Sequence, residues 1–167
     1  LIATASATIY NYMYMYATPI GVKGAYDVNF YAGLDFTNAS GSITNYRQSV
    51  TFTGMQGSNG SLATYSDPVR ICNNGSIIYN VELTFDSWTF GGSADTTLNY
   101  VNVTLYDASN FVGCMSLIPA GGGNVTTGAY DLTASAWWRV QWDIRWYANA
   151  TAGTDSANIN LKIIVHD

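Results

Sequence analysis

The sequence is poor in charge. Only 10% of its 167 residues are charged, whereas about a quarter is usual for a soluble domain. Glu82 is the single glutamate, and the basic residues number six. Because exposed helix faces usually carry Glu, Lys and Arg, this composition disfavours helices. With a net charge of −5 the chain also lacks the basic stripe that neutralises phosphates, so we expect no nucleic-acid partner.

Residues for catalysis or metal binding are scarce as well. The single histidine, His166, is the penultimate residue, which is a poor position for a general base. No cluster of His, Cys and carboxylates has the spacing of a transition-metal site. Glu82 and Asp86 could face the same side of a strand as a glycosidase pair would, but a solvated outer face explains them equally well. We therefore expect no enzyme, no cofactor and no metal.

Long hydrophobic runs are missing too. No apolar run reaches the roughly 18 residues of a membrane helix, and the first residues lack the basic and apolar regions of a signal peptide. The chain begins with Leu1 instead of Met. The sequence therefore predicts a mature, extracellular protein whose signal peptide has been cleaved, with no membrane span.

Two further features are typical of exported proteins. Cys72 and Cys114 are the only cysteines, and they could form one disulfide in an oxidising compartment or remain two buried thiols. The chain also holds six N-x-S/T sequons as candidates for N-linked glycans. They are at Asn38, Asn59, Asn74, Asn102, Asn124 and Asn149.

What the chain does contain is a series of short runs that alternate between apolar and polar residues. The clearest is AWWRVQWDIRWYANA, in which Trp138, Val140, Trp142, Ile144 and Trp146 share one face. Such runs recur at 25–33, 49–55, 69–72, 76–85, 98–106, 111–118 and 157–167, with a phase change around 86–88 that indicates a bulge. About eight or nine strands separated by turns predict an all-β fold, a jelly-roll-like antiparallel β-sandwich.

The first stretch, LIATASATIYNYMYMYATPIG, alternates in the same way but is unusually long. Sixteen extended residues would span roughly 50 Å, whereas a compact domain of this length is about 40 Å across. No charge or proline protects this strand before Pro19, so its unpaired backbone is a template for association. We divide the chain into a donor strand at 1–18, a hinge at 19–24 and the sandwich at 25–167.

The donor strand is expected to enter an open groove of another copy of the chain. One parity of the strand is small and apolar and suits a core, while the other carries hydroxyl groups and aromatic rings. Since donor and acceptor surfaces differ, the contact propagates head to tail. The alternative is a strand bent between two sheets of one monomer. The residues assigned to the donor function are Ala3, Ala5, Ala7, Ile9, Tyr10, Tyr12, Met13 and Tyr14.

The N-terminal pattern ATASATIYNYMYMYATPI, on an Asn-, Thr- and Tyr-rich β-sandwich with many sequons, resembles the archaeal bundling-pilus and thread subunits. Those are similar in turn to the bacterial TasA and camelysin biofilm-fibre proteins. The resemblance implies a jelly-roll subunit that polymerises outside the cell by donor-strand complementation, forms filaments that can bundle, and joins cells in biofilms.

Two other classes of function remain open. A secreted carbohydrate-binding module would stack sugars on an exposed Trp137 or Tyr147. A jelly-roll surface-layer or capsid protein would form lattices or shells instead of fibres.

Overall fold

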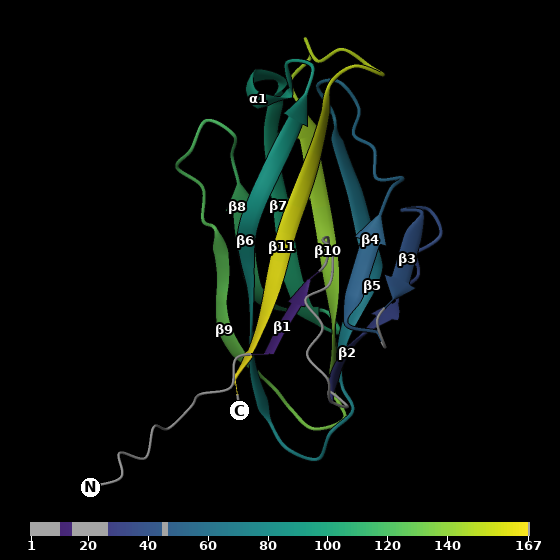
Figure 1. The fold of residues 1–167 in the computed structure, drawn as a ribbon, viewed down its shortest axis with the longest axis vertical. Coiled ribbons are helices and arrows are strands. Elements are labelled where there is room, and N and C mark those ends of the chain that lie inside the picture. Colours follow the sequence, from purple (N-terminus) through teal and green to yellow (C-terminus); the bar gives the residue numbers. More distant parts are fainter. Residues whose placement is uncertain (1–10, 15–26, 45–46, 167) are drawn as a thin grey trace, which may run out of the picture.

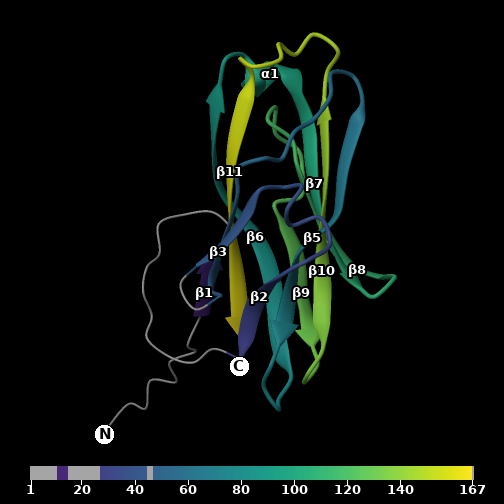
Figure 2. The same cartoon turned by 90° about the vertical axis from the view of Figure 1, so that its right-hand side faces the viewer.

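The chain forms a sandwich of two β-sheets (Figures 1 and 2), seen in a computed structural model that describes residues 11–14, 27–44 and 47–166. One sheet has six strands in the order β3-β4-β1-β11-β6-β9, and the other has five in the order β2-β5-β10-β7-β8. The strands are β1 (Asn11–Tyr14), β2 (Val28–Ala32), β3 (Gly41–Thr44), β4 (Ser49–Phe52), β5 (Leu62–Asn73), β6 (Tyr79–Gly91), β7 (Leu98–Asp107), β8 (Asn110–Leu117), β9 (Thr126–Leu132), β10 (Trp137–Trp146) and β11 (Ser156–His166). The prediction of an all-β sandwich is confirmed.

The core lies between the two sheets and follows the alternation in the sequence. Val140 of β10 is fully buried and Trp138 is 3% exposed, while Arg139 and Gln141 between them lie on the outer face. In the opposite sheet, Leu161, Ile163 and Val165 of β11 are buried. Because side chains alternate across a strand, each strand gives one apolar row to the core and one polar row to solvent.

The longest ladder of the six-stranded sheet joins β11 to β6, antiparallel from Ser156 opposite Gly91 to His166 opposite Asn80. Its register shifts where Asn160 and Leu161 oppose Ser87 and Phe85, which leaves Asp86 as the extra residue. The bulge predicted around residues 86–88 is therefore confirmed. We call the end of the sandwich near His166 the base and the opposite end, near Ser156, the top.

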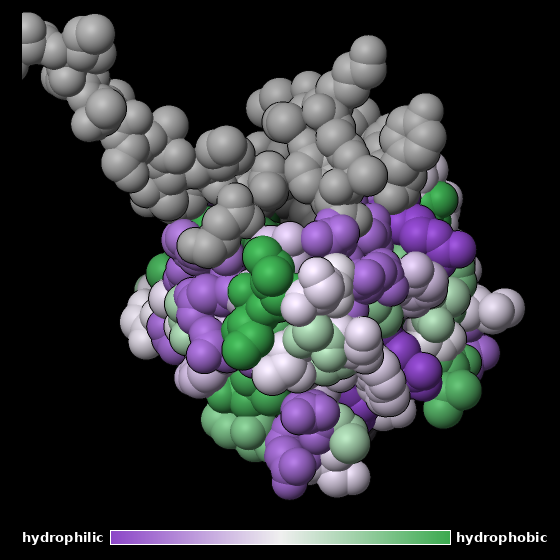
Figure 3. Space-filling view, turned by 90° about the horizontal axis from the view of Figure 1, so that it is seen from below, coloured by the Kyte–Doolittle hydropathy of each residue, from purple (hydrophilic) through white to green (hydrophobic). Residues whose placement is uncertain are grey.

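At the base, the loop between β5 and β6 exposes two apolar side chains. Ile77 and Ile78 are 52% and 55% exposed, although both lie within the alternating run at 76–85. The structure begins β6 two residues later, at Tyr79. Seen from the base, the described surface is mixed, with apolar side chains exposed among polar ones (Figure 3).

Three strand segments differ from the sequence-based expectation. β3 and β9 lie outside the alternating runs from which strands are predicted, and β5 begins at Leu62 and runs through Pro68. Within the described ranges the helical content is one turn, α1 (Ala94–Thr97), before β7.

The predicted disulfide is wrong for this structure, because both cysteines are free. Cys72 lies on β5 and Cys114 on β8, and β10 and β7 separate these strands in the sheet. Three interstrand spacings amount to about 14 Å, twice the Cα separation that a disulfide tolerates. The alternative of two free thiols holds, and burial raises the pKa of the Cys72 thiol to about 11.

Candidate functional site

The candidate site is a gap in the six-stranded sheet, between β4 and β11. β1 occupies the lower part of this gap: Asn11 is opposite Val165 and Tyr14 is opposite Lys162, in antiparallel register. On its other side β1 forms a parallel pair with β4, through Tyr14 and Ser49. Within the described residues, β1 therefore fills the place of a strand over the four residues Asn11–Tyr14.

Above β1, both sides of the gap are strand edges that no described residue pairs with. β11 continues upward for six residues, 156–161, which pair with β6 but with no strand on the β1 side among the described residues. Facing them, β4 pairs with β3 on its far side and with β1 only at Ser49. Six residues of strand correspond to about 20 Å. We call this upper gap the slot.

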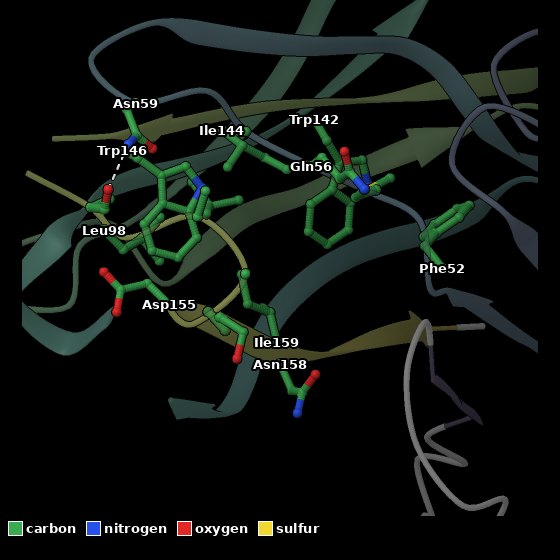
Figure 4. A pocket seen from close by; sticks show the side chains of 18 of the residues that line it. Phe52, Gln56, Asn59, Leu98, Trp142, Ile144, Trp146, Asp155, Asn158 and Ile159 are labelled. Atoms are coloured by element: carbon green, nitrogen blue, oxygen red, sulfur yellow. Dashed lines mark hydrogen bonds between the residues drawn. The ribbon is translucent and has the colours of Figure 1, made fainter. Parts of the chain in front are cut away.

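The floor of the slot is part of the hydrophobic core. A cavity of about 590 Å³ opens there, and its lining includes Leu98 and Val101 of β7 and Trp142, Ile144 and Trp146 of β10. In Figure 4, Leu98, Ile144 and Trp146 line it from one sheet and Ile159 from the other, whereas Asn158 points away from the cavity. An apolar floor beneath two unpaired edges suits an inserted strand that carries apolar residues on one face.

One side of the slot is formed by the irregular segment that follows β4. The Tyr65 hydroxyl accepts a hydrogen bond from the Gln56 backbone N–H at 2.7 Å, and Gly60 N–H donates to the Trp146 carbonyl at 3.1 Å. Gly57 lies so close to the Trp146 ring that a Cβ atom would be 2.3 Å from Cδ1. The segment is thereby attached to the five-stranded sheet, and the slot separates it from β11.

The loop between β10 and β11 lies at the top of the slot and lines part of the cavity. Asn59 Nδ2 donates to the Ala150 carbonyl at 2.5 Å, linking this loop to the segment after β4 (Figure 4). The Asp155 carboxylate accepts hydrogen bonds from Thr151 N–H, Ser93 N–H and the Thr97 hydroxyl, at 2.8 to 2.9 Å. These bonds, the one from Thr151 N–H above all, lower the pKa of Asp155.

One polar atom in the lining is buried without a partner. Trp142 is 6% exposed, and its indole Nε1 has no hydrogen-bond acceptor among the described residues. A buried N–H in this state costs about 1–3 kcal/mol relative to a bonded one.

The predicted donor residues divide into two groups. Tyr12, Met13 and Tyr14 belong to β1 in the six-stranded sheet of their own chain. Ala3, Ala5, Ala7, Ile9 and Tyr10, and the hinge at 19–24, lie outside the described residues. Sequence reasoning assigned the strand but did not find the slot, because the slot depends on how strands far apart in the sequence pair.

The candidate glycosylation sites lie at different depths. Asn38, Asn59, Asn74, Asn124 and Asn149 are exposed. Asn102 lies on the outer face of β7, as the alternation predicted, but it is half-buried and its side-chain oxygen is buried without a partner in the described structure. These positions remain candidates.

The aromatic residues proposed for sugar stacking are exposed, Trp137 by 38% and Tyr147 by 48%. The Arg70 guanidinium lies over the Trp137 ring, 4.3 Å from its centre, so it covers one of the two faces that a sugar could use. Trp138 and Trp142, by contrast, are core residues, as the alternation predicted.

The polar residues weighed for chemistry are part of ordinary surface contacts. The Thr126 hydroxyl donates to the Glu82 carboxylate, and Asp86 forms an ion pair with Lys162. Across residues 11–14, 27–44 and 47–166, no three His, Cys, Asp or Glu side chains lie close enough together to hold a metal ion. In the same ranges, no helix is long and apolar enough to cross a membrane.

No protein-family model matches the chain, and no curated protein is significantly similar to it.

Proposed function

We propose that the protein is the structural subunit of an extracellular filament and that it polymerises head to tail by donor-strand complementation. The observation that carries the proposal is the slot, a position with an apolar floor and two strand edges that no described residue pairs with. An open sheet edge over a core invites pairing with another chain. The filament would serve adhesion, bundling and biofilm formation, with N-linked glycans on its surface.

The same chain offers a segment suited to the slot. Residues 1–10 are uncharged, and their odd positions from Ala3 to Ile9 are small or aliphatic. Placed in the slot, this row would cover Leu98, Ile144 and Trp146, and the backbone would satisfy both edges. Burial of apolar area at about 25 cal/mol per Å² and a new hydrogen-bond ladder would both favour insertion.

Deletion of residues 1–10 tests the proposal, because it removes the donor and leaves β1 in place. The full chain is expected to form fibres in negative-stain electron micrographs, and the shortened chain is expected to remain monomeric with an unchanged far-ultraviolet circular dichroism spectrum. Fibres from the shortened chain would contradict the proposal. Single particles from the full chain would also contradict it and would favour a binding module.

Point substitutions give a matched control for the deletion. Ala5→Asp and Ile9→Asp place a charge on the apolar row and should block assembly, since an unpaired charge is strongly disfavoured in a core. Ser6→Asp and Thr8→Asp place the same charge on the other face of the strand and should leave assembly largely intact. Equal effects on assembly from the odd-numbered and the even-numbered substitutions would argue against insertion of this strand.

A further inference from the structure

We propose that the missing-strand position is shared between two copies: β1 of the same chain fills the base half, and a six-residue stretch within residues 1–10 of a second copy fills the slot from the top, antiparallel to β11. This inference rests on the proposed function and adds which residues pair, in which direction and at which end. It also restricts the donor to residues 1–10, because residues 11–14 complete their own domain.

The first step of the argument concerns how far the chain's own linker can reach. To fill the slot to its end, the strand would have to continue from Tyr14, opposite Lys162, until residue 20 reached the level of Ser156. The chain must be back at the base by Asp27, whose carboxylate accepts a hydrogen bond from the Tyr79 hydroxyl at 2.7 Å.

The distances do not allow this path. From Ser156 to His166, β11 has ten steps, or about 33 Å. The seven steps from residue 20 to residue 27 span at most about 25 Å. Pro19 would in addition remove one donor from the ladder. The top of the slot therefore needs a segment from elsewhere.

The second step concerns direction. Asn11 is opposite Val165 near the base, so residues 1–10 join β1 at the base of their own copy. If that base lies on the top of a neighbour, the segment enters the neighbour's slot at the level of Ser156, with residue 10 outermost. It then runs antiparallel to β11 and in line with the neighbour's own β1, so one strand direction continues through the whole gap.

The third step concerns register. The inward row of β11 has odd numbers: Leu161 is buried, and Ala157 and Ile159 pack against the core. The apolar row of the donor also has odd numbers, so Ala5, Ala7 and Ile9 must lie opposite odd positions of β11. Two registers meet this condition. In one, Ile9 is opposite Ala157 and Thr8 is therefore opposite Asn158. In the other, the donor is shifted by two residues and Ser6 is opposite Asn158. Both pairs lie on the outer face, where Asn158 is exposed.

Disulfide trapping in the full chain tests the trans half of the inference, which is the pairing of residues 1–10 of one copy with β11 of another. All variants also carry Cys72→Ser and Cys114→Ser. One variant carries Asn158→Cys and another carries Thr8→Cys or Ser6→Cys. The two variants are mixed, assembled into fibres and mildly oxidised. We expect either Thr8→Cys or Ser6→Cys to form a covalent dimer with Asn158→Cys on a non-reducing gel. The matched control Ala7→Cys, on the inward row, should yield none with Asn158→Cys.

The cis half of the inference is the pairing of β1 with β11 of the same chain. It is tested in one chain that carries both Tyr12→Cys and Ile164→Cys, because these two residues are direct partners across β1 and β11. Loss of both thiols without any dimer, in monomers and in fibres, is the expected result. A covalent ladder from this pair would overturn the inference, because residues 11–14 would then be the donor. The inference would also be overturned by fibres in which neither Thr8→Cys nor Ser6→Cys forms a disulfide with Asn158→Cys.

The failures of the two proposals are distinguishable. If the chain forms no fibres, the proposed function fails, and with it the trans half of the inference, whereas the Tyr12–Ile164 bond within one chain still reports on the cis half. If fibres form and the cysteine pairs do not bond as expected, only the inference fails. A bond between residues 8 and 158 within one dilute chain would also overturn it.

Discussion

Gly57 lies against the indole ring of Trp146, and a Cβ atom at Gly57 would be 2.5 Å from Nε1 of that ring. The contact attaches one wall of the slot to its floor. Any side chain at residue 57 must therefore displace the ring or move the wall.

We expect Gly57→Ala to lower the free energy of unfolding by about 1–3 kcal/mol, the usual cost of an extra methyl group in a packed site. Because Trp146 lines the slot, the same change should slow fibre growth. Urea unfolding and light scattering measure the two effects. Ser58→Ala, at an exposed neighbouring residue, is the control, and equal behaviour of the two variants would mean that the Trp146 contact is unimportant.

Acid should weaken the loops tied by Asp155 and Asp35. Hydrogen bonds from backbone N–H groups lower the pKa of both carboxyls, chiefly from Thr151 to Asp155 and from Asp67 to Asp35. A lowered folded pKa means that the stabilisation is present above the unfolded value of 3.8 and is lost as the pH falls through the lower folded value.

The melting temperature followed from pH 6 to pH 2 checks this expectation. Asp155→Asn should melt earlier than the wild type at pH 6, and the difference should shrink toward pH 2. Asp95→Asn, an exposed carboxyl of α1 near the same loop, serves as the control. A gap between wild type and Asp155→Asn that stays constant with pH would contradict the assignment.

The Cys72 thiol should react slowly while the protein is folded. A pKa raised by burial from 9.0 to about 11 reduces the thiolate at pH 8 about 100-fold, and the thiolate is the reactive form. Alkylation by iodoacetamide followed by peptide mass spectrometry measures the rate in folded and urea-unfolded protein. Comparable rates in the two states would show that the folded thiol is not protected.

The sequon at Asn102 should carry no glycan in cell-derived protein once the domain has folded. Its side-chain oxygen is buried, and Thr104 of the same sequon is 6% exposed, with its hydroxyl donating to Cys114 Sγ at 3.2 Å. Glycopeptide mass spectrometry should find any occupancy at the exposed sequons, such as Asn124 and Asn149. A glycan at Asn102 would mean that modification precedes folding.

Local periodicity was sufficient to predict the sandwich, because rows such as Trp138 to Trp146 fix which face of a strand is buried. It could not predict the slot, which depends on strands far apart in the sequence: β1 ends at Tyr14, opposite Lys162, while β11 continues to Ser156. Nor could it reject the disulfide, because the separation of Cys72 and Cys114 depends on the strand order. Short, weakly apolar strands such as β3 gave too little signal to be distinguished from loops.

The ladder between β6 and β11 spans the sandwich from top to base, nearly parallel to its longest axis (Figure 1). Its hydrogen bonds lie across the strands, so a pull between the two ends of the subunit acts as shear and must break many of them together. A donor aligned with β11 would be loaded in the same way at every junction. Such a fibre would withstand tension far better than peeling, in which the bonds open one after another.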